Sequence, residues 1–397
     1  MAKGTINVCL LGYGFMGRAH SNAYAKVKKF FDLPIEPIMH TIVDVDPVAL
    51  EAFARRWGWA NTSTDYRKSF TDPDIGLVDV TSANNAHAEM SIVALEAGKH
   101  VLCEKPMAGT LDDARQMRDA ARKAKKCRTF VSYCYRRVPA VALARQLTQE
   151  GRLGRIYHIR AWYLQDWAGP EVPLLWRFVK KVSGSGALGD LAAHIIDMAR
   201  FITGDEFSEV SGAIQETFIK EREIPSAGSR GGIAAGAAGG TAKKGKVDVD
   251  DATLFLARMK GGAIATFEAT RFATGNQNKN GMEINGEKGS IMFNFEDMNL
   301  LSFYDATLPR REHGWRRIMV THTPDHPYAA NWWPDAHIIG YEHTFVNQVA
   351  DMMLDIAGQK PVVPLADFED AYKTQQVLEA AAQSAANRCP VKLSEIK

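Results

Sequence analysis

The sequence has few cysteines, and they form no pattern that would bind a metal or build a disulfide framework. Its 397 residues include five cysteines, which are scattered and contain no Cys-x-x-Cys pair. This usage predicts a reduced, cytoplasmic protein without a structural zinc site. No apolar stretch approaches the ~18 residues of a membrane span, and the short run Ile6–Leu11 does not read as a signal peptide. We therefore expect no membrane partner.

An excess of charge of either sign is also missing. Lys and Arg number 48 and Asp and Glu number 46, which gives a net charge of +2. Nucleic-acid-binding proteins show a basic face or tail, so this balance argues against a nucleic-acid partner. Hydrophobic residues make up 46% and charged residues 24%, as in ordinary globular proteins. The length predicts two domains.

Short apolar runs alternate with helical patterns in the first third of the chain. Strands separated by helices of about 10–15 residues predict a parallel, doubly wound sheet. We expect a dinucleotide-binding Rossmann domain over residues 1–135. The predicted strands are Ile6–Leu11, Ile38–Val43, Leu77–Val80, His100–Cys103 and Thr129–Tyr133. The predicted helices are Gly17–Phe31, Pro47–Trp57, Ala86–Ala97 and Leu111–Lys125.

The pattern changes in residues 136–397, where successive strands are joined by glycine-containing turns. It predicts an α+β domain for substrate binding and oligomerisation, with a large, mainly antiparallel open sheet. Because one face of such a sheet usually needs a partner, we expect a homodimer or homotetramer through this sheet. Residues 228–246 are rich in Gly and Ala and predict a flexible surface loop. The predicted strands are Ile156–Tyr163, Glu209–Phe218, Ala252–Met259, Gly262–Arg271, Met282–Asn285 and Ser290–Phe295. The predicted helices are Ala140–Glu150, Gly186–Ile202, Tyr341–Ile356 and Asp367–Asn387.

A glycine-rich motif, G-x-G-x-x-G, lies between the first predicted strand and the first helix. Gly12 permits a tight turn, Gly14 lets the backbone approach a pyrophosphate, and Gly17 allows close helix packing. The N–H groups at the start of the helix then face the phosphates. We expect the loop, including Phe15 and Met16, to bind a dinucleotide.

An acidic residue after the second predicted strand bears on the choice of cofactor. Asp44 lies where a carboxylate accepts hydrogen bonds from the ribose hydroxyls and would repel a 2′-phosphate. No basic residue follows it directly to hold such a phosphate, which favours NAD over NADP. The alternative is that Asp44 or Asp46 only caps the helix that begins at Pro47.

Polar residues also follow the third and fourth predicted strands, where the ligands of open parallel sheets bind. Ser82, Asn84 and His87 come after the third strand, and Glu104 and Lys105 after the fourth. We expect these five residues to contact the cofactor, with Lys105 also able to donate hydrogen bonds to a substrate hydroxyl.

A third cluster lies in the second domain. Asp190, His194 and Asp197 are spaced by four and three, so they share one face of a helix. A carboxylate one turn before an imidazole can fix its tautomer and stabilise the imidazolium. The alternative is a buried structural histidine beside an ordinary helix-start aspartate. No third ligand at a suitable spacing points to a metal.

Taken together, these motifs resemble the Gfo/Idh/MocA oxidoreductases, which act on sugars and inositols with a nicotinamide cofactor. The resemblance covers essentially the whole chain, and within the family the chain looks most like dehydrogenases of levoglucosan and other pyranosides. It departs from the family at Ala83, where Pro is frequent, and at Cys134, where Asn is frequent. The segments that carry it, in order, are Gly12-x-Gly14-x-x-Gly17, Asn84-x-x-His87, Glu104-Lys105-Pro106, Tyr135-Arg136-Arg137-x-Pro139, Tyr163–Trp167, Trp176–Phe178, Gly184–Asp190, Asp190-x-x-x-His194-x-x-Asp197, Val247–Asp251 and His326–Tyr328.

The resemblance implies an NAD-dependent dehydrogenase of a sugar or polyol, with Lys105, Asp190 and His194 as the catalytic group and a cis Lys105-Pro106 peptide. Either His194 or Lys105 can be the base at this point. Substrate contacts are expected from Asp190, His194 and four further residues, Tyr135, Tyr163, Gln165 and Arg177. The rival interpretations are an NADPH-dependent keto-sugar reductase of the same fold and a non-catalytic dinucleotide-binding sensor.

Overall fold

The computed structural model describes residues 4–225 and 240–397. Within these ranges, no helix is both long and apolar enough to cross a membrane. The chain forms two compact units, and each consists of two segments. The first comprises Met1–Arg137 and Gly340–Tyr372, and the second comprises Val138–Ile339 and Lys373–Lys397.

The segment 340–372 corrects the predicted domain division, which assigned everything after residue 135 to the second domain. A buried ion pair is one physical reason. The Nε atom of Arg137 lies 3.2 Å from Oδ2 of Asp351, and both side chains are almost completely buried. Arg137 also donates to the carbonyl oxygen of Val363. A charge pair at this depth is stable only when both partners are present, so the returning segment is fixed to the first unit.

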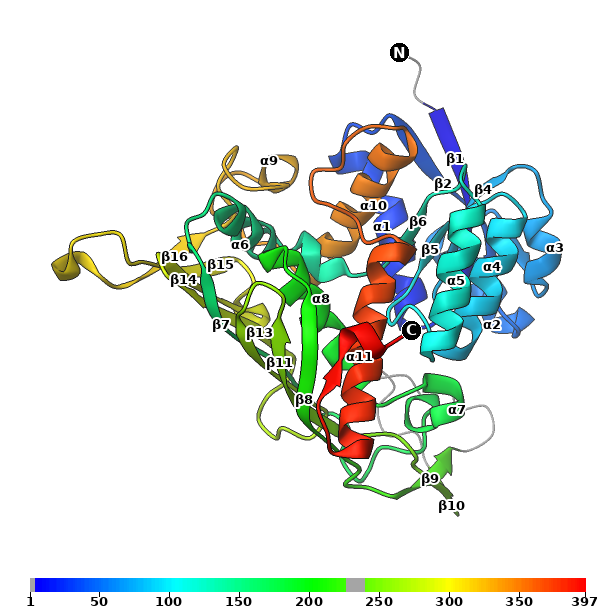
Figure 1. Cartoon of the computed structure of the whole chain (residues 1–397). Coiled ribbons are helices and arrows are strands. Elements are labelled where there is room, and N and C mark those ends of the chain that lie inside the picture. The colour runs from blue at the N-terminus through cyan, green and yellow to red at the C-terminus, as the bar shows by residue number, and fades with distance from the viewer. Residues whose placement is uncertain (1–3, 226–239) are drawn as a thin grey trace. The chain divides into compact units, whose positions relative to one another are not determined.

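The first unit contains a six-stranded sheet that confirms the predicted doubly wound Rossmann fold. Its strands are β1 (Gly4–Leu11), β2 (Ile35–Val43), β3 (Asn61–Ser63), β4 (Ile75–Val80), β5 (His100–Cys103) and β6 (Thr129–Val131). Its helices are α1 (Phe15–Phe30), α2 (Pro47–Trp57), α3 (Tyr66–Phe70), α4 (His87–Glu96), α5 (Leu111–Lys123) and α10 (Tyr341–Ile356). All strands are parallel, in the order β3-β2-β1-β4-β5-β6. Helices α1 and α10 pack together on one face, and α4 and α5 on the other (Figure 1).

The second unit confirms the predicted α+β architecture with a large, mainly antiparallel sheet. The nine strands of this sheet are β7 (Ile156–Leu164), β8 (Phe207–Glu216), β11 (Ala252–Met259), β12 (Ile264–Thr270), β13 (Lys279–Gly286), β14 (Gly289–Asn294), β15 (Leu300–Asp305), β16 (Trp315–Met319) and β17 (Val391–Lys392). Their order is β16-β15-β14-β13-β7-β12-β11-β8-β17, and β7 and β12 are the pair that runs parallel. The sequence analysis did not predict β15, β16 or β17.

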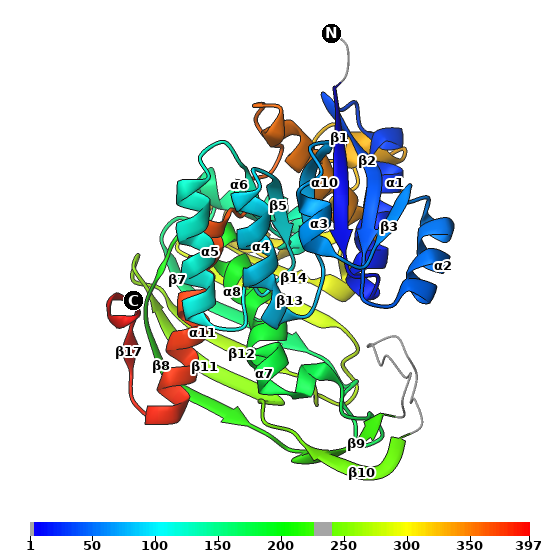
Figure 2. The ribbon, with the colours of Figure 1, turned by 90° about the vertical axis from the view of Figure 1, so that its right-hand side faces the viewer.

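Helices cover one face of this sheet and leave the other open (Figures 1 and 2). The helices of the unit are α6 (Pro139–Gln149), α7 (Lys180–Ser183), a π-helical turn (Leu188–Ala192), α8 (Ala193–Thr203), α9 (Ala329–Trp332) and most of α11 (Phe368–Asn387). Helix α6 contacts β14 and β15, and α8 contacts β7 and β13. The alternation of buried and exposed residues along β11 and β12 shows that their other side chains face outward.

The predicted loop 228–246 is corrected at its end. Residues 228–239 lie outside the described residues. Gly240–Lys246 form β10, which pairs antiparallel with β9 (Glu221–Pro225) in a separate two-stranded sheet. Pairing with β9 gives the backbone of residues 240–246 hydrogen-bond partners that composition alone does not reveal.

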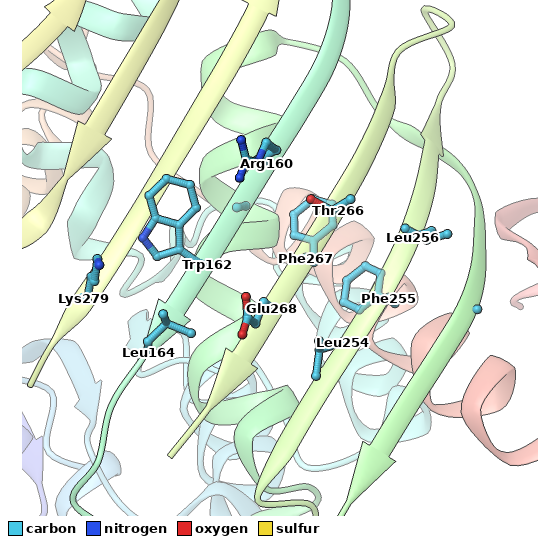
Figure 3. Close-up of a pocket in the computed structure, with 12 residues that line it drawn as sticks. Arg160, Trp162, Leu164, Leu254, Phe255, Leu256, Thr266, Phe267, Glu268 and Lys279 are labelled. Carbon is cyan, nitrogen blue, oxygen red and sulfur yellow. The ribbon is translucent and has the colours of Figure 1, made fainter. Parts of the chain in front are cut away.

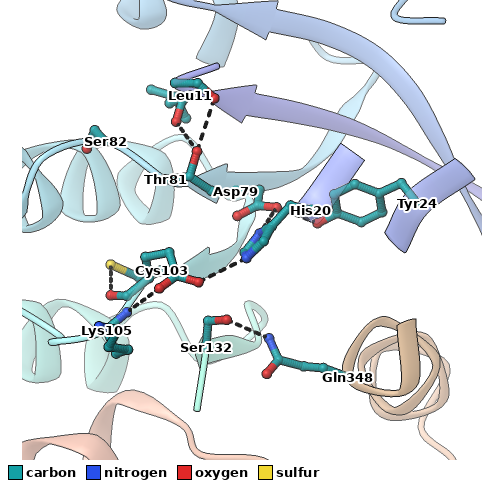
Figure 4. A network of polar contacts seen from close by, with 12 residues as sticks. Leu11, His20, Tyr24, Asp79, Thr81, Ser82, Cys103, Lys105, Ser132 and Gln348 are labelled. Atoms are coloured by element: carbon teal, nitrogen blue, oxygen red, sulfur yellow. Dashed lines mark hydrogen bonds and ion pairs between the residues drawn. The ribbon is translucent and has the colours of Figure 1, made fainter. Parts of the chain in front are cut away.

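A buried histidine joins α1 to two strands of the Rossmann sheet. The Nδ1 atom of His20 lies 2.8 Å from Oδ2 of Asp79 in β4, and Nε2 lies 2.9 Å from Oε1 of Glu104 after β5 (Figure 4). The hydroxyl of Tyr24 donates to the same Asp79 oxygen. Burial alone would lower the pKa of His20, but Asp79 and Glu104 outweigh it and raise this pKa to about 10. The side chain is therefore an imidazolium between two carboxylates at neutral pH.

This arrangement predicts a stability that falls at alkaline pH. The pKa of His20 is raised from 6.5 to about 10, so its contribution is complete below about pH 6.5 and is lost as the pH rises toward 10. Chemical unfolding between pH 6.5 and 10 should show a slope that approaches about 1.4 kcal/mol per pH unit for this one proton. His20→Gln should flatten the slope, whereas Tyr24→Phe, which leaves the imidazolium in place, should preserve it. Equal slopes in the unsubstituted protein and His20→Gln would contradict the assignment.

Candidate functional site

The turn between β1 and α1 has the shape that a dinucleotide pyrophosphate requires. Gly12 has a φ of +99°, and a Cβ on Gly17 would lie 2.1 Å from the Gly12 carbonyl oxygen. Thr81 stabilises the turn, because its hydroxyl donates to the carbonyl oxygens of Leu11 and Gly12. A Cβ on Gly14, by contrast, would meet nothing within 4 Å. The middle glycine therefore borders open space at the N-terminus of α1, where backbone N–H groups are free to bind phosphate.

The two aspartates after β2 have separate roles. Asp46 is the N-cap of α2, and its Oδ1 accepts from the backbone N–H groups of Val48 and Ala49, each at 3.2 Å. Asp44 instead turns toward the glycine loop, where Oδ2 accepts from the Tyr13 N–H at 3.4 Å. Asp44 is half-buried at the carboxyl end of β2. This position fits a carboxylate that binds the ribose of NAD.

The turn after β4 contains three of the residues expected to contact the cofactor, of which two are partly exposed and one is buried. Ser82 and Asn84 are partly exposed at the carboxyl end of the strand. His87 is completely buried, with Nδ1 3.0 Å from the Pro106 carbonyl oxygen and Nε2 3.2 Å from that of Ser82. Burial lowers its pKa, so the ring is neutral. A neutral imidazole carries one N–H and can donate to only one of these carbonyl oxygens, and the cofactor contact expected of His87 stays a prediction.

Glu104 is buried as well, and the cofactor contact expected of it also stays a prediction. Its side chain is 4% exposed, and its carboxylate is occupied by His20 on Oε1 and by the backbone N–H of Lys105 on Oε2 at 3.1 Å (Figure 4). Burial would raise the pKa of Glu104, but His20 and Lys105 outweigh it and lower this pKa. Lys105 itself is half-buried and precedes a cis peptide bond to Pro106. Glu104 therefore supports the backbone on which Lys105 is presented.

In the second unit, the loop that precedes β11 fixes the start of the helix that carries Asp190 and His194. Asp250 accepts from the N–H groups of Gly186 on Oδ1 and Leu188 on Oδ2, each at 2.7 Å. A Cβ on Gly186 would lie 1.7 Å from the Asp250 carbonyl oxygen. The predicted regular helix begins as a π-helical turn over Leu188–Ala192 and becomes α-helical at Ala193. Such turns occur frequently at functional sites.

The polar residues around this turn carry both signs of charge. The side chain of Asp190 is 19% exposed, and its Oδ2 accepts from Nη2 of Arg271 at 2.9 Å. Arg177 also lies near Asp190, and burial lowers the pKa of its guanidinium. His194 is 6% exposed, and its ring centroid lies 5.8 Å from that of Tyr163. These side chains form a charged, half-buried cluster that can exchange protons and bind hydroxyl groups.

Two of the expected substrate ligands meet at a residue that the sequence analysis missed. Tyr163 and Gln165 both donate to Oδ1 of Asn278, at 2.8 and 2.7 Å, and Trp167 donates to Oε1 of Gln165. Trp167 packs on Phe178, so its ring is part of a small apolar core. Tyr135 belongs to the first unit, where it is 3% exposed and packs near Tyr341.

Arg271, Asp250 and Asn278 were not identified as site residues, although each lies at or near the end of a strand or helix. Their position could have identified them in the sequence, because polar residues at strand ends frequently line binding and catalytic sites. Their partners are distant in the chain, so only the fold brings them together. In the described parts of the chain, no three His, Cys, Asp or Glu side chains gather as they would around a metal ion.

Each of the two units contains a segment that matches a known protein family. Residues 6–133 match the model of the oxidoreductase family with an NAD-binding Rossmann fold, and residues 141–292 match that of the GFO/IDH/MocA C-terminal domain. Levoglucosan dehydrogenase of Pseudarthrobacter phenanthrenivorans is 42% identical, with 98% of this chain and 99% of the relative covered. Myo-inositol 2-dehydrogenase of Thermotoga maritima is 28% identical over 72% of this chain and 74% of that protein.

Solved structures give the same result. An oxidoreductase domain protein from Kribbella flavida is 48% identical with a TM-score of 0.91, over 98% of this chain and 99% of that chain. A structure described as levoglucosan dehydrogenase in complex with NADH and levoglucosan is 40% identical with a TM-score of 0.89, at the same coverage. The resemblance inferred from the motifs is thereby confirmed. The protein is an oxidoreductase with an NAD-binding Rossmann domain, and the chain belongs to the Gfo/Idh/MocA family.

Proposed function

We propose that the protein is an NAD-dependent dehydrogenase that oxidises a secondary hydroxyl of a pyranoside sugar such as levoglucosan to the ketone. The observation that carries this proposal is the 42% identity to a levoglucosan dehydrogenase over 98% of the chain. The half-buried Asp44 supports NAD over NADP, and the open glycine loop supports binding of a dinucleotide of either kind. These features give no support to an NADPH-dependent keto-sugar reductase.

In this proposal the glycine loop and Asp44 hold the dinucleotide, while the second unit handles the substrate proton. The chemistry that NAD supplies when bound is acceptance of a hydride from the substrate carbon. Nδ1 of His194 is buried, so we assign the hydroxyl proton to Nε2. Asp190, four residues before His194, stabilises the imidazolium through its negative charge. In the first unit, Lys105 donates a hydrogen bond to the developing alkoxide.

The choice of His194 as base follows from the ordinary basicity of the two candidates. Imidazole is the side chain that most often takes a proton in catalysis, whereas an ammonium group must first lose one. For substrate contacts we propose Tyr135 in the first unit and Tyr163, Gln165 and Arg177 in the second. Support for the last three comes from their contacts around Asn278 and Asp190.

The protein is proposed to work in the cytoplasm. All five cysteines are free thiols in the structure. Burial raises the pKa of Cys9 and of Cys134 to about 12 in each case, so both are protonated and inert at neutral pH. A set of unpaired thiols suits a reducing compartment.

A homodimer or homotetramer through the outer face of the nine-stranded sheet is also proposed. This face carries exposed apolar side chains on three strands, at Ile214, Leu254, Leu256 and Ile264. Beside them is a shallow hollow of about 490 Å³ that Trp162, Glu268 and other side chains line (Figure 3). An apolar patch on a sheet face is typical of a surface that a second copy covers.

The substrate proposal predicts which compounds support NAD reduction. Levoglucosan and simple pyranosides should give the highest kcat/KM in a panel that also contains inositols and free glucose, assayed with NAD and NADP. A clear preference for an inositol would mean that the substrate is a polyol and not a pyranoside, while the proposed reaction, oxidation of a secondary hydroxyl, would stand. The absence of turnover with every member would contradict the proposal.

Replacement of the proposed base should affect turnover and leave cofactor binding unchanged. We expect His194→Ala to lower kcat by roughly 10²- to 10⁴-fold, the usual contribution of a positioned proton acceptor. Asp190→Asn keeps the side-chain shape but removes the charge, so its defect should also fall mainly on kcat. NAD affinity, measured by calorimetry, should stay constant in both variants. Normal turnover by His194→Ala would identify Lys105 as the leading candidate for the base.

Asp44 should determine the preference for NAD. We expect Asp44→Ala to weaken NAD binding by roughly 10- to 100-fold, because a hydrogen bond to a charged group contributes about 1.5–3 kcal/mol, and to narrow the gap to NADP. Asp46→Ala is the matched control, since it removes the cap of α2 and costs about 1 kcal/mol of stability without touching the ribose site. Calorimetry that found tighter binding of NADP than NAD to the unsubstituted protein would refute this assignment.

The proposed interface predicts a change in mass. Leu256→Glu should dissociate the oligomer, because it places a charge at the centre of the apolar face. Val362→Glu makes the same change at an exposed site in the first unit, and it should leave the mass unchanged. Light scattering after size exclusion measures both. A monomeric unsubstituted protein would rule out the interface.

A further inference from the structure

Arg271 is a buried arginine in contact with a proposed catalytic carboxylate. It follows the last residue of β12 and is 1% exposed, and its Nη2 donates to Oδ2 of Asp190 at 2.9 Å. Its backbone N–H donates to the Asp251 carbonyl oxygen at 3.0 Å, and Nη1 lies 3.4 Å from the Arg177 carbonyl oxygen. The backbone and the two Nη atoms thus fix the side chain, which leaves the ion pair little freedom.

The surroundings of the guanidinium strengthen this contact. Its central carbon lies 5.4 Å from the ring centroid of Trp167 and 5.8 Å from that of Phe178. These rings belong to the apolar cluster that also contains Ala168 and Leu175. Water has little access here, so the attraction between Arg271 and Asp190 is screened much less than at the surface.

A second guanidinium, that of Arg177, also lies near the Asp190 carboxylate. Arg177 lies close enough to interact electrostatically with Asp190 and with Arg271, and its own ring neighbour is Trp176. In the described part of the second unit, two guanidiniums thus lie at the carboxylate four residues before His194, and the ring of Tyr163 lies beside the His194 imidazole. Both cations offset the negative charge that Asp190 presents to His194.

This balance matters because an isolated carboxylate beside an imidazole favours its protonated form. A histidine that is already protonated at neutral pH cannot accept a proton from a substrate. We propose that Arg271 is a positioning residue for proton transfer: it fixes the Asp190 carboxylate and offsets part of the charge that this carboxylate presents to His194. The proposal rests on the assignment of His194 as base.

The test compares two buried arginines that stack on the same phenylalanine. Arg222 is 2% exposed and lies 4.0 Å from the Phe178 ring centroid, but it donates to the carbonyl oxygens of Ala168, Gly169 and Val172. Arg222→Met therefore removes a buried guanidinium without touching Asp190. It is the matched control for Arg271→Met.

Two properties are measured in each variant: the titration midpoint of His194 and the pH dependence of turnover. In substrate-free protein with ¹³C-labelled histidine, NMR should show the titration midpoint of His194 about one pKa unit higher in Arg271→Met and unchanged in Arg222→Met. The acid limb of kcat/KM should move upward by the same amount, so that kcat/KM at a fixed pH on that limb should fall roughly tenfold. Arg271→Lys should retain the midpoint, because the charge remains, but should lower kcat, because an ammonium lacks the planar fork.

The outcomes separate this inference from the proposed function. An unshifted midpoint and an unchanged kcat/KM on the acid limb in Arg271→Met would overturn the inference, whatever His194→Ala shows. If Arg271→Met does not fold, a normal kcat in Arg271→Lys would overturn it instead. A shifted midpoint together with normal turnover by His194→Ala would overturn the assignment of the base, while the electrostatic link between Arg271 and His194 would stand.

Discussion

Two backbone contacts that leave no room for a Cβ atom determine where the functional helices of this protein begin. In the first unit, Gly17 at the start of α1 lies against the carbonyl oxygen of Gly12. In the second, Gly186 lies against the carbonyl oxygen of Asp250, just before the turn that carries Asp190. Each contact fixes the first turn of a helix against a neighbouring loop. The N–H groups of α1 and the side chains of the second helix are oriented by these contacts before any ligand arrives.

Buried charge is balanced in both units, but for different purposes. In the first unit, His20 as an imidazolium neutralises much of the charge of Asp79 and Glu104, and Glu104 in turn holds the backbone of Lys105. In the second, Arg271 pairs with Asp190. Burial of an unpaired charge is costly, so each pair holds its elements in one arrangement. The first balance is structural, whereas the second lies next to the residues proposed to move a proton.

The patterns in the sequence predicted the Rossmann domain closely, because its signals are local. The period of apolar residues, the glycine motif and the acidic residue after β2 all depend on neighbours within a few positions. Strands β15 and β16 were missed, as was the pairing of Gly240–Lys246 with β9, because these depend on partners that composition does not name. The segment 340–372 was assigned to the wrong unit, since a helix pattern does not say which surface it covers.

The same distinction applies to the candidate site. The sequence by itself determined which chemical groups are available: the glycine loop, Asp44, Lys105, Asp190 and His194. Only the tertiary structure decided how they are used. It buried His87 beside the carbonyl oxygens of Ser82 and Pro106 and Glu104 beside His20 and the N–H of Lys105. It also brought Arg271 from the end of β12 to Asp190 across 81 residues of sequence. Hydrogen bonds and ion pairs act over a few ångströms in space, so distance along the chain could not predict these partnerships.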